Sequence, residues 1–273
     1  MHIADLLSAG RSLGVDRLDV QLLLSHHLRQ PRSWLLAHDK DTLPAAISAL
    51  CLGQLQRRAA GEPLAYLLGE WQFRGLTLQV SPAVLIPRPE TEVLVDWALD
   101  CLAAAPLASV VDLGTGSGAI ALALAAAVPG LQITASDASP EALALARSNA
   151  SRLGLPVHLA QGDWWAAVDA QRFGLAVSNP PYVAAGDAHL DALRHEPSMA
   201  LTPGGDGLDA LRRIVDGAPA HLLEGAWLLV EHGHDQAEAV RAMLAGRGFE
   251  HAATRCDLAG LPRCSGGCWT HAG

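Results

Sequence analysis

The stretch that decides the fold of this 273-residue chain is Asp112-Leu113-Gly114-Thr115-Gly116-Ser117-Gly118. An apolar run from Ser109 precedes it, and an alanine- and leucine-rich run from Ala119 follows it. Glycines let a backbone turn tightly and approach a ligand, and a helix that begins beside them presents free N–H groups to an anion. A buried strand, a glycine-rich turn and a helix in this order predict an α/β sheet that binds a nucleotide.

Strands and helices are expected to alternate around and after this turn. Apolar runs predict strands at residues 108–112, 131–136, 156–160, 173–178 and 226–231. Helical spacing predicts helices at about 117–127, 139–153, 207–221 and 235–246, and residues 249–270 have the pattern of one or two further strands. Such alternation predicts a parallel sheet with helices on both faces.

The first part of the chain has a different pattern. Leucines at helical spacing in Asp16–Leu28 and Leu43–Ala60 indicate that residues 1–70 are all-helical. Alternating apolar residues around Gly75 then predict a hairpin at 71–80, and several prolines stiffen the connection that follows. We therefore expect a helical N-terminal domain at 1–70, a hairpin and linker at 71–88, and an α/β domain at 89–273.

Composition excludes several classes of protein. The net charge is −9, of which residues 1–75 contribute +1 and residues 76–273 contribute −10, and Lys40 is the only lysine. An acidic body is a poor match for duplex nucleic acid, so no direct DNA binding is expected. No apolar run reaches the roughly 18 residues of a membrane span, and the N-terminus lacks the features of a signal peptide. Five cysteines are interpreted as reduced thiols, so a cytoplasmic protein, by default a monomer, is expected.

Two acidic positions follow the next strands. Asp137 ends the 131–136 strand, 19 residues after Gly118, where an acid commonly accepts hydrogen bonds from ribose hydroxyls. The alternative is that it caps the helix that starts near Ser139. Asp163-Trp164 follows the third strand, where an acid and an indole can bind the amino group and the ring of adenine. The alternative there is a surface acid beside a core tryptophan.

The fourth predicted strand ends at Asn179-Pro180-Pro181-Tyr182. Two prolines cannot continue a strand, because proline lacks an N–H and has a fixed φ. The resulting rigid turn has free carbonyls, an amide before it and an aromatic ring after it. These groups can hold a flat –NH2 group, since oxygens accept its two N–H bonds while the ring covers its face. The alternative is a strand-ending turn with a solvent-exposed tyrosine.

Together, residues 112–118, Asp137 and the Asn-Pro-Pro-Tyr turn resemble the class I S-adenosylmethionine-dependent methyltransferases. Further stretches resemble, more narrowly, the family of peptide chain release factor N5-glutamine methyltransferases (the PrmC/HemK family). They are Leu85–Glu92, Glu196-Pro197, Gly204–Leu208 and Glu231-His232-Gly233. The resemblance implies a helical bundle followed by a seven-stranded Rossmann-like sheet. It also implies methylation of the glutamine in the Gly-Gly-Gln motif of bacterial release factors, which are then the protein partners.

The same resemblance implies roles for individual residues. The cofactor, S-adenosyl-L-methionine, is expected at Gly114, Thr115, Gly116, Ser117, Gly118, Asp137, Asp163, Trp164 and Asn179. The substrate glutamine is expected at Asn179, Pro180, Pro181 and Tyr182, with Asn179, Pro180 and Tyr182 as the catalytic residues. In this hypothesis the Asn179 side-chain oxygen and the Pro180 carbonyl accept the two amide N–H bonds. Apart from the resemblance, the junction residues Arg88 and Glu90-Thr91-Glu92 could contact the protein substrate; the alternative is that Thr91 or the acids cap a helix.

Three other interpretations stay open at this point. An N6-adenine nucleic-acid methyltransferase would grip an exocyclic amine with the same turn. A non-catalytic nucleotide-binding module or a nicotinamide dehydrogenase would use the same glycines. The C-terminal stretch from Arg263 to Trp269 departs from the family pattern, and its cysteines, with Cys256 and His271, do not have the spacing of a zinc site. No metal is therefore expected.

Overall fold

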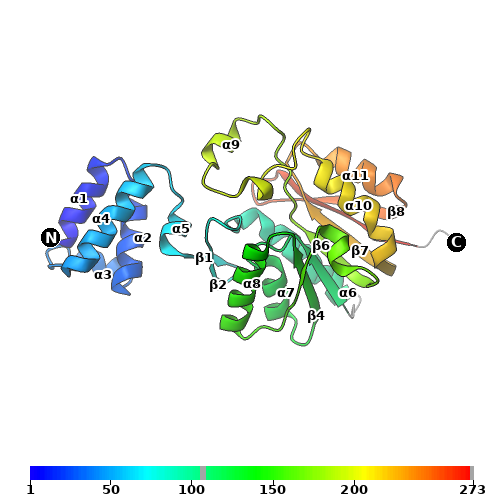
Figure 1. Ribbon diagram of the computed structural model, residues 1–273, viewed down its shortest axis with the longest axis horizontal. Coiled ribbons are helices and arrows are strands. Elements are labelled where there is room, and N and C mark those ends of the chain that lie inside the picture. The colour runs from blue at the N-terminus through cyan, green and yellow to red at the C-terminus, as the bar shows by residue number, and fades with distance from the viewer. Residues whose placement is uncertain (105–108, 271–273) are drawn as a thin grey trace. The chain divides into compact units, whose positions relative to one another are not determined.

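The computed structural model describes residues 1–104 and 109–270, and the chain divides into two compact units, Met1–Glu70 and Trp71–Gly273. The first unit is helical (Figure 1). Its helices are α1 (Ile3–Ser12), α2 (Arg17–Leu28), α3 (Arg32–Ala37), α4 (Ala45–Ala59) and α5 (Leu64–Leu68). The two segments with leucines at helical spacing correspond to α2 and α4.

Local sequence explains how these helices start and pack. The Asp16 side chain accepts the backbone N–H of Leu18 (2.6 Å) and so caps α2. Gly10 of α1 lies so close to α2 that an added Cβ would come within 2.4 Å of Val20 Cγ2. The buried Gln54 side chain of α4 donates to the carbonyl of Leu67 in α5 (2.8 Å), which ties the last short helix to the bundle.

The second unit begins with a hairpin and is dominated by one large sheet. The hairpin strands are β1 (Glu70–Phe73) and β2 (Leu76–Gln79), and η1 (Pro89–Thr91) and α6 (Glu92–Ala104) follow. The large sheet contains β3 (Ser109–Leu113), β4 (Gln132–Asp137), β5 (His158–Gln161), β6 (Phe173–Ser178), β7 (Leu222–Glu231), β8 (Phe249–Cys256) and β9 (Pro262–Trp269). Its strand order is β5-β4-β3-β6-β7-β9-β8.

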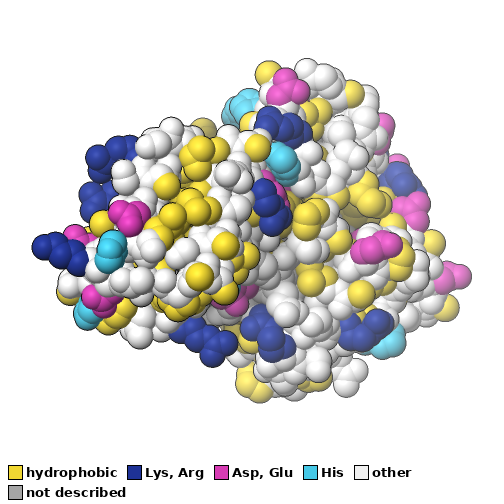
Figure 2. Space-filling model, turned by 60° about the vertical axis from the view of Figure 1, so that its left-hand side comes forward, with side chains coloured by type: hydrophobic (Ala, Val, Ile, Leu, Met, Phe, Trp, Pro, Cys, Tyr) yellow, Lys and Arg dark blue, Asp and Glu magenta, His cyan; other side chains and the backbone are white. Residues whose placement is uncertain are grey.

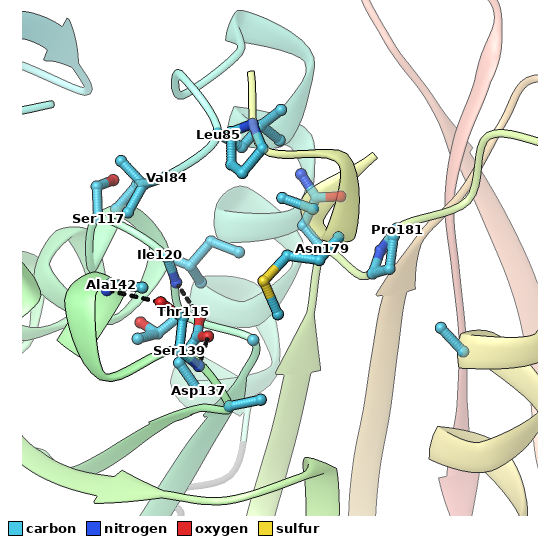
Figure 3. Close-up of a pocket in the computed structure, with 18 of the residues that line it drawn as sticks. Val84, Leu85, Thr115, Ser117, Ile120, Asp137, Ser139, Ala142, Asn179 and Pro181 are labelled. Carbon is cyan, nitrogen blue, oxygen red and sulfur yellow. Dashed lines mark hydrogen bonds between the residues drawn. The ribbon is translucent and has the colours of Figure 1, made fainter. Parts of the chain in front are cut away.

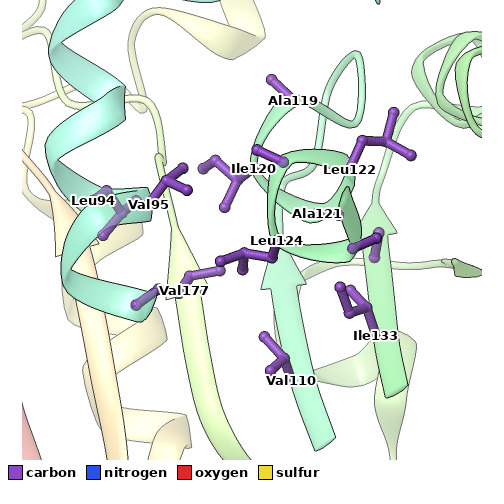
Figure 4. Packing of buried hydrophobic residues seen from close by; sticks show 14 of the residues in the cluster. Leu94, Val95, Val110, Ala119, Ile120, Ala121, Leu122, Leu124, Ile133 and Val177 are labelled. Atoms are coloured by element: carbon purple, nitrogen blue, oxygen red, sulfur yellow. The ribbon is translucent and has the colours of Figure 1, made fainter. Parts of the chain in front are cut away.

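Helices cover both faces of this sheet. The long ones are α7 (Ala119–Ala127), α8 (Pro140–Leu153), α10 (Asp209–His221) and α11 (Ala237–Gly246), with short turns η2 (Trp164–Val168), α9 (His189–Ala192) and η3 (Ser198–Ala200). On one face Leu94 of α6 and Leu124 of α7 pack toward Val110 and Val177 of the sheet (Figure 4). On the other face α10 and α11 cover β6 and β7.

The strands expected to be parallel are parallel, and the last stretch, for which no direction was predicted, adds an antiparallel strand near one edge. Strands β5, β4, β3, β6 and β7 pair in parallel, but β9 runs antiparallel to both β7 and β8. The reason is the short connection between β8 and β9, in which the backbone N–H of Asp257 donates to the carbonyl of Leu261 (2.8 Å). A turn of this length can join only antiparallel neighbours, because a parallel pair needs a crossover of a dozen residues or more.

The C-terminal stretch that departs from the family pattern is strand β9. It is paired on both sides, and its glycines suit that place. A Cβ on Gly266 would lie 2.4 Å from Leu229 Cδ2, and one on Gly267 would lie 2.9 Å from Phe249 Cβ. Small residues are therefore required where β9 passes between β7 and β8.

Candidate active site

A cavity of about 340 Å³ lies at the carboxyl ends of β3, β4 and β6 (Figure 3). Open α/β sheets bind ligands at this edge, where the strand order reverses. Its wall includes the glycine-rich turn after β3, Asp137 at the end of β4, Asp163 and Trp164 after β5, and Asn179 and Pro181 after β6. The structure thus brings together residues from four motifs that the sequence places far apart.

The glycine-rich turn needs its glycines. Gly114, Gly116 and Gly118 have φ values of 74°, 56° and 85°, a region that other residues rarely adopt. The backbone N–H groups of Gly114 and Thr115 both donate to the carbonyl of Ser136 (2.8 Å each), which ties the turn to the end of β4. The turn is therefore preorganised against the cavity.

Asp112 holds the turn from below. It is fully buried, and its Oδ2 accepts hydrogen bonds from Thr115 Oγ1 (2.6 Å) and from the backbone N–H of Ala121 (3.2 Å). Burial raises the pKa of this carboxyl to about 7. Asp112 opens the glycine-rich motif, but its place in the sequence gives no sign of its role. Its contacts show that it joins β3, the turn and α7.

Asp137 connects the turn to the following helix. Its Oδ2 accepts the backbone N–H of Gly116 (2.9 Å), and its Oδ1 accepts that of Ser139 (2.9 Å). The alternative that Asp137 is the helix cap is wrong, because the Ser139 hydroxyl caps α8 by accepting the N–H of Ala142 (3.1 Å). Burial raises the pKa of Asp137, although three backbone N–H bonds oppose this. The Asp137 carboxylate lines the cavity, and its remaining lone pairs can accept hydrogen bonds from hydroxyl groups.

The two adjacent tryptophans separate into different environments. Trp164 has a φ of 50° and lies over the glycine turn, where a Cβ on Gly114 would come within 3.1 Å of its ring. Trp165 is buried, and its Nε1 donates to the carbonyl of Ile214 (2.8 Å). Asp163 lines the cavity and pairs with Arg213 of α10 (2.5 Å). The Trp164 indole and the half-exposed Asp163 carboxylate therefore form part of the cavity wall, while the Trp165 indole packs in the core.

Two residues of the turn after β6 form part of the cavity wall. Asn179 and Pro181 line the cavity, whereas Pro180 is buried and neither it nor Tyr182 is a lining residue. The Asn179 Nδ2 donates to Thr91 Oγ1 (3.2 Å). Tyr182 is half-buried and its hydroxyl donates to Glu231 Oε1 (3.2 Å), so the alternative of a solvent-exposed tyrosine is wrong. The substrate contacts expected of Pro180 and Tyr182 stay predictions.

Comparison with known proteins places this fold and cavity in a family. A family model described as a methyltransferase small domain matches residues 91–208, and one described as the PrmC N-terminal domain matches residues 2–69. The release factor glutamine methyltransferase of Bordetella pertussis is 51% identical over 257 residues, which cover 93% of this chain and 95% of that protein. The chain belongs to the release factor glutamine methyltransferase family.

Further comparisons agree with this family. The release factor glutamine methyltransferase of Xylella fastidiosa (strain Temecula1) is 47% identical over 264 residues, with 96% of each chain covered. A methyltransferase from Pyrococcus furiosus has a similar structure, with a TM-score of 0.53 at 16% identity over 72% of this chain and 90% of that chain. The predicted fold class is confirmed: a seven-stranded Rossmann-like methyltransferase sheet after a helical N-terminal domain and a hairpin.

Several residues around the cavity were not predicted as site residues. Glu196 accepts the backbone N–H of Ile86 (3.1 Å) and pairs with Arg88. Arg88 is thus engaged within the chain, and Thr91 is buried beneath Asn179. Glu196 and Glu231 occur in stretches that carried the family resemblance, but a carboxylate at a strand end or in a loop gives no sign of its partner. Only the folded chain identifies them as parts of the site.

The possible metal ligands do not assemble in the described part of the chain. Within residues 1–104 and 109–270 no group of three or more His, Cys, Asp and Glu side chains is arranged to hold a metal ion. Cys264 is buried in β9, Cys256 is exposed, and His271 lies outside the described residues. None of the described helices has the length and apolar character that crossing a bilayer requires.

Proposed function

We propose that this chain transfers the methyl group of S-adenosylmethionine to the side-chain amide nitrogen of the glutamine in the Gly-Gly-Gln motif of bacterial peptide chain release factors. The observation that carries the proposal is the placement of the Asn179 amide. Its nitrogen is engaged by Thr91, which leaves its oxygen to accept a hydrogen bond in a cavity shared with the glycine-rich turn. The names of the relatives support the substrate.

The cofactor residues follow from the cavity wall. Residues 114–118 approach the cofactor with their backbone, and Asp137 accepts hydrogen bonds from the ribose hydroxyls. Trp164 covers one face of the adenine, and Asp163 accepts a hydrogen bond from the adenine amino group. Asn179 contacts both the cofactor and the substrate. These roles are consistent with the lining of one continuous cavity by all of these segments.

The chemistry requires positioning more than a strong base. A carboxamide nitrogen is a weak nucleophile because its lone pair is delocalised into the carbonyl group. The Asn179 side-chain oxygen and the Pro180 carbonyl accept its two N–H bonds and hold the nitrogen in line with the sulfonium methyl group. Such positioning can lower the barrier by several kcal/mol. The N–C bond forms as the C–S bond breaks, and the two acceptor oxygens stabilise the positive charge that develops on nitrogen.

The reaction is completed without a covalent enzyme intermediate. The nitrogen carries an extra proton after methyl transfer, and a protonated amide is a strong acid that releases this proton to water. The products are the methylated glutamine and S-adenosylhomocysteine. Tyr182 packs against the flat substrate group, and Pro181 forms the adjoining wall of the cavity.

A protein substrate fits this chain better than duplex nucleic acid. The net charge of residues 76–273 is −10, and on the face that Figure 2 shows, charged side chains of both signs are interspersed among apolar ones. We propose that the helical unit at residues 1–70 recognises the release factor, since it exposes large apolar side chains that can contact a protein: Leu13, Leu18, Leu36 and Leu50. A peptide with the Gly-Gly-Gln motif should therefore be a poorer substrate than the intact factor.

The decisive experiment uses radiolabelled S-adenosylmethionine with a release factor and, in parallel, with DNA. Label on the glutamine of the Gly-Gly-Gln motif supports the proposal, and label on DNA supports an N6-adenine methyltransferase instead. Tight cofactor binding without label on either would indicate a non-catalytic module. Asn179→Ala should abolish transfer while cofactor affinity falls less, and a near wild-type rate in this variant contradicts the mechanism.

Oligomeric state and location complete the proposal. We expect a monomer that acts in the cytoplasm, where release factors work. Light scattering at the assay concentration tests the first point, and fractionation of the producing cells tests the second. A stable dimer or a membrane-associated pool contradicts them.

A further inference from the structure

Two residues of the Asn-Pro-Pro-Tyr turn are joined to a buried polar cluster beneath the cavity. Asn179 Nδ2 donates to Thr91 Oγ1 (3.2 Å), and the Tyr182 hydroxyl donates to Glu231 Oε1 (3.2 Å). Thr91 is 4% exposed and Glu231 is 1% exposed. Thr91 comes from η1 and Glu231 ends β7, so elements far apart in the sequence supply the cluster. Neither Thr91 nor Glu231 takes part in the proposed methyl transfer itself.

The carboxyl of Glu231 is the acceptor at the centre of this cluster. Burial raises its pKa to about 7, while hydrogen bonds from the Thr91 and Tyr182 hydroxyls and the charge of Arg263 favour the ionised form. Glu90 is the charged neighbour that opposes ionisation. Among the described residues, Oε2 has no hydrogen-bond partner within ordinary limits. Above pH 7 this carboxyl is mostly ionised, so the cluster then has capacity to accept hydrogen bonds and little capacity to donate them.

This capacity determines the direction of the hydrogen bonds. A threonine hydroxyl has one proton and two lone pairs, whereas an ionised carboxylate only accepts. If Thr91 gives its proton to Glu231, it can offer only a lone pair to Asn179. The –NH2 end of the Asn179 amide must then face Thr91, and its oxygen must face the cavity. With the amide reversed, two –NH2 groups would meet, and the substrate amide would lose an acceptor.

We propose that Thr91 and Glu231 are positioning residues, which orient the Asn179 amide so that its oxygen and not its nitrogen meets the substrate amide. The Glu231 carboxylate accepts the Tyr182 hydroxyl, so Thr91 holds one end of the turn and Glu231 holds the other. The proposal rests on the proposed function for the identity of the substrate, but the orientation itself is a property of the free protein.

The kinetic test removes the Thr91 hydroxyl at constant shape. Thr91→Val should lower kcat about a hundredfold, the cost of misplacing a group that positions the substrate. Thr91→Ser keeps the hydroxyl and should stay close to wild type. Thr134→Val is the matched control, because Thr134 is also a buried threonine but lies in β4 outside the cluster. In all three variants the melting temperature and the affinity for S-adenosylhomocysteine should change little. The loss of kcat in Thr91→Val then does not come from unfolding or from loss of the cofactor.

A second measurement does not depend on turnover. The side-chain amide of Asn179, observed by NMR in protein labelled with ¹⁵N-asparagine, should shift and lose protection from exchange in Thr91→Val. It should also change in Glu231→Gln, because a glutamine amide can donate as well as accept. It should be unchanged in Thr91→Ser and in the control Thr134→Val.

The outcomes separate this proposal from the proposed function. If wild type labels a release factor but Thr91→Val keeps its kcat, or Thr91→Ser loses as much, the positioning role is wrong. If wild type labels no release factor, the proposed function fails. The NMR comparison then decides the positioning role alone: a change confined to Thr91→Val and Glu231→Gln supports it, and an unchanged Asn179 amide overturns it.

Discussion

Gly114→Ala should weaken cofactor binding in addition to destabilising the fold. Gly114 has a φ of 74°, and a Cβ built there lies 3.1 Å from Cζ3 of the Trp164 ring. That distance is shorter than the 3.4–4 Å of ordinary contact, so the ring must move by a few tenths of an ångström. The perturbation therefore acts on the indole that we propose covers the adenine.

Two costs add up in Gly114→Ala, one from the backbone conformation and one from the contact with Trp164. Alanine in the left-handed region costs about 1–2 kcal/mol of folding stability, whatever surrounds it. Overpacking against a neighbouring side chain costs about 1–3 kcal/mol, and part of this cost is released if the ring moves into the cavity. A bound cofactor would resist that movement, so we expect S-adenosylhomocysteine to bind about tenfold more weakly, which corresponds to about 1.4 kcal/mol.

Gly154→Ala provides a matched control. Gly154 has a φ of 66° at the C-terminal end of α8, and a Cβ there meets nothing within 4 Å. Urea unfolding should show a loss of stability for both variants, larger for Gly114→Ala by the overpacking cost that movement of the ring does not release. Calorimetric titration should show weaker binding for Gly114→Ala alone. Equal affinity of Gly114→Ala and wild type, or an equal loss in Gly154→Ala, would refute the assignment of this wall to the cofactor.

Two further predictions concern buried carboxyls. Glu196→Ala should lower the free energy of unfolding by about 2 kcal/mol in urea titrations, because the N–H of Ile86 loses its acceptor while Arg88, one-third exposed, regains water. Glu196→Gln keeps an acceptor and should lose less stability. An equal loss in the two variants contradicts this account. The pKa of Glu231 is raised by burial from 4.5 to about 7, so between these pH values the native state holds a proton that the unfolded chain has released. The free energy of unfolding of wild type should therefore fall relative to that of Glu231→Gln as pH rises from 4.5 to 7, and the difference between the two should stay constant above pH 7. A constant difference between pH 4.5 and 7 would show that Glu231 is not titrating there.

Much of the fold could be predicted because its signals are local. The glycines of residues 114–118 are needed for backbone angles within the turn itself, and the Pro180-Pro181 pair ends β6 wherever that strand lies. Ser139 and Asp137 are close enough in sequence that either could be the cap, and local pattern could not separate them. The last two strands were predicted without a direction, because the signal for direction is the length of the connection after β8, not the apolar pattern of the strands.

The residues beneath the site could not be predicted in the same way. Thr91 and Asn179 are 88 positions apart, Tyr182 and Glu231 are 49 apart, and Ile86 and Glu196 are 110 apart. No periodicity or spacing encodes such pairs, because they arise from the packing of η1 and of the loop after β6 against the ends of the sheet. Even the resemblance to a family marked these stretches without indicating which atoms meet.

The sequence by itself determined the order of strands and helices, the glycine-rich turn and the rigid turn after β6, since each depends on angles and groups within a few residues. It therefore predicted that a nucleotide site and a planar nitrogen site both exist. Tertiary structure alone decided that they share one cavity. It also decided which group holds the Asn179 amide, because the buried Thr91 hydroxyl, from a distant element, is the partner seen for its nitrogen among the described residues.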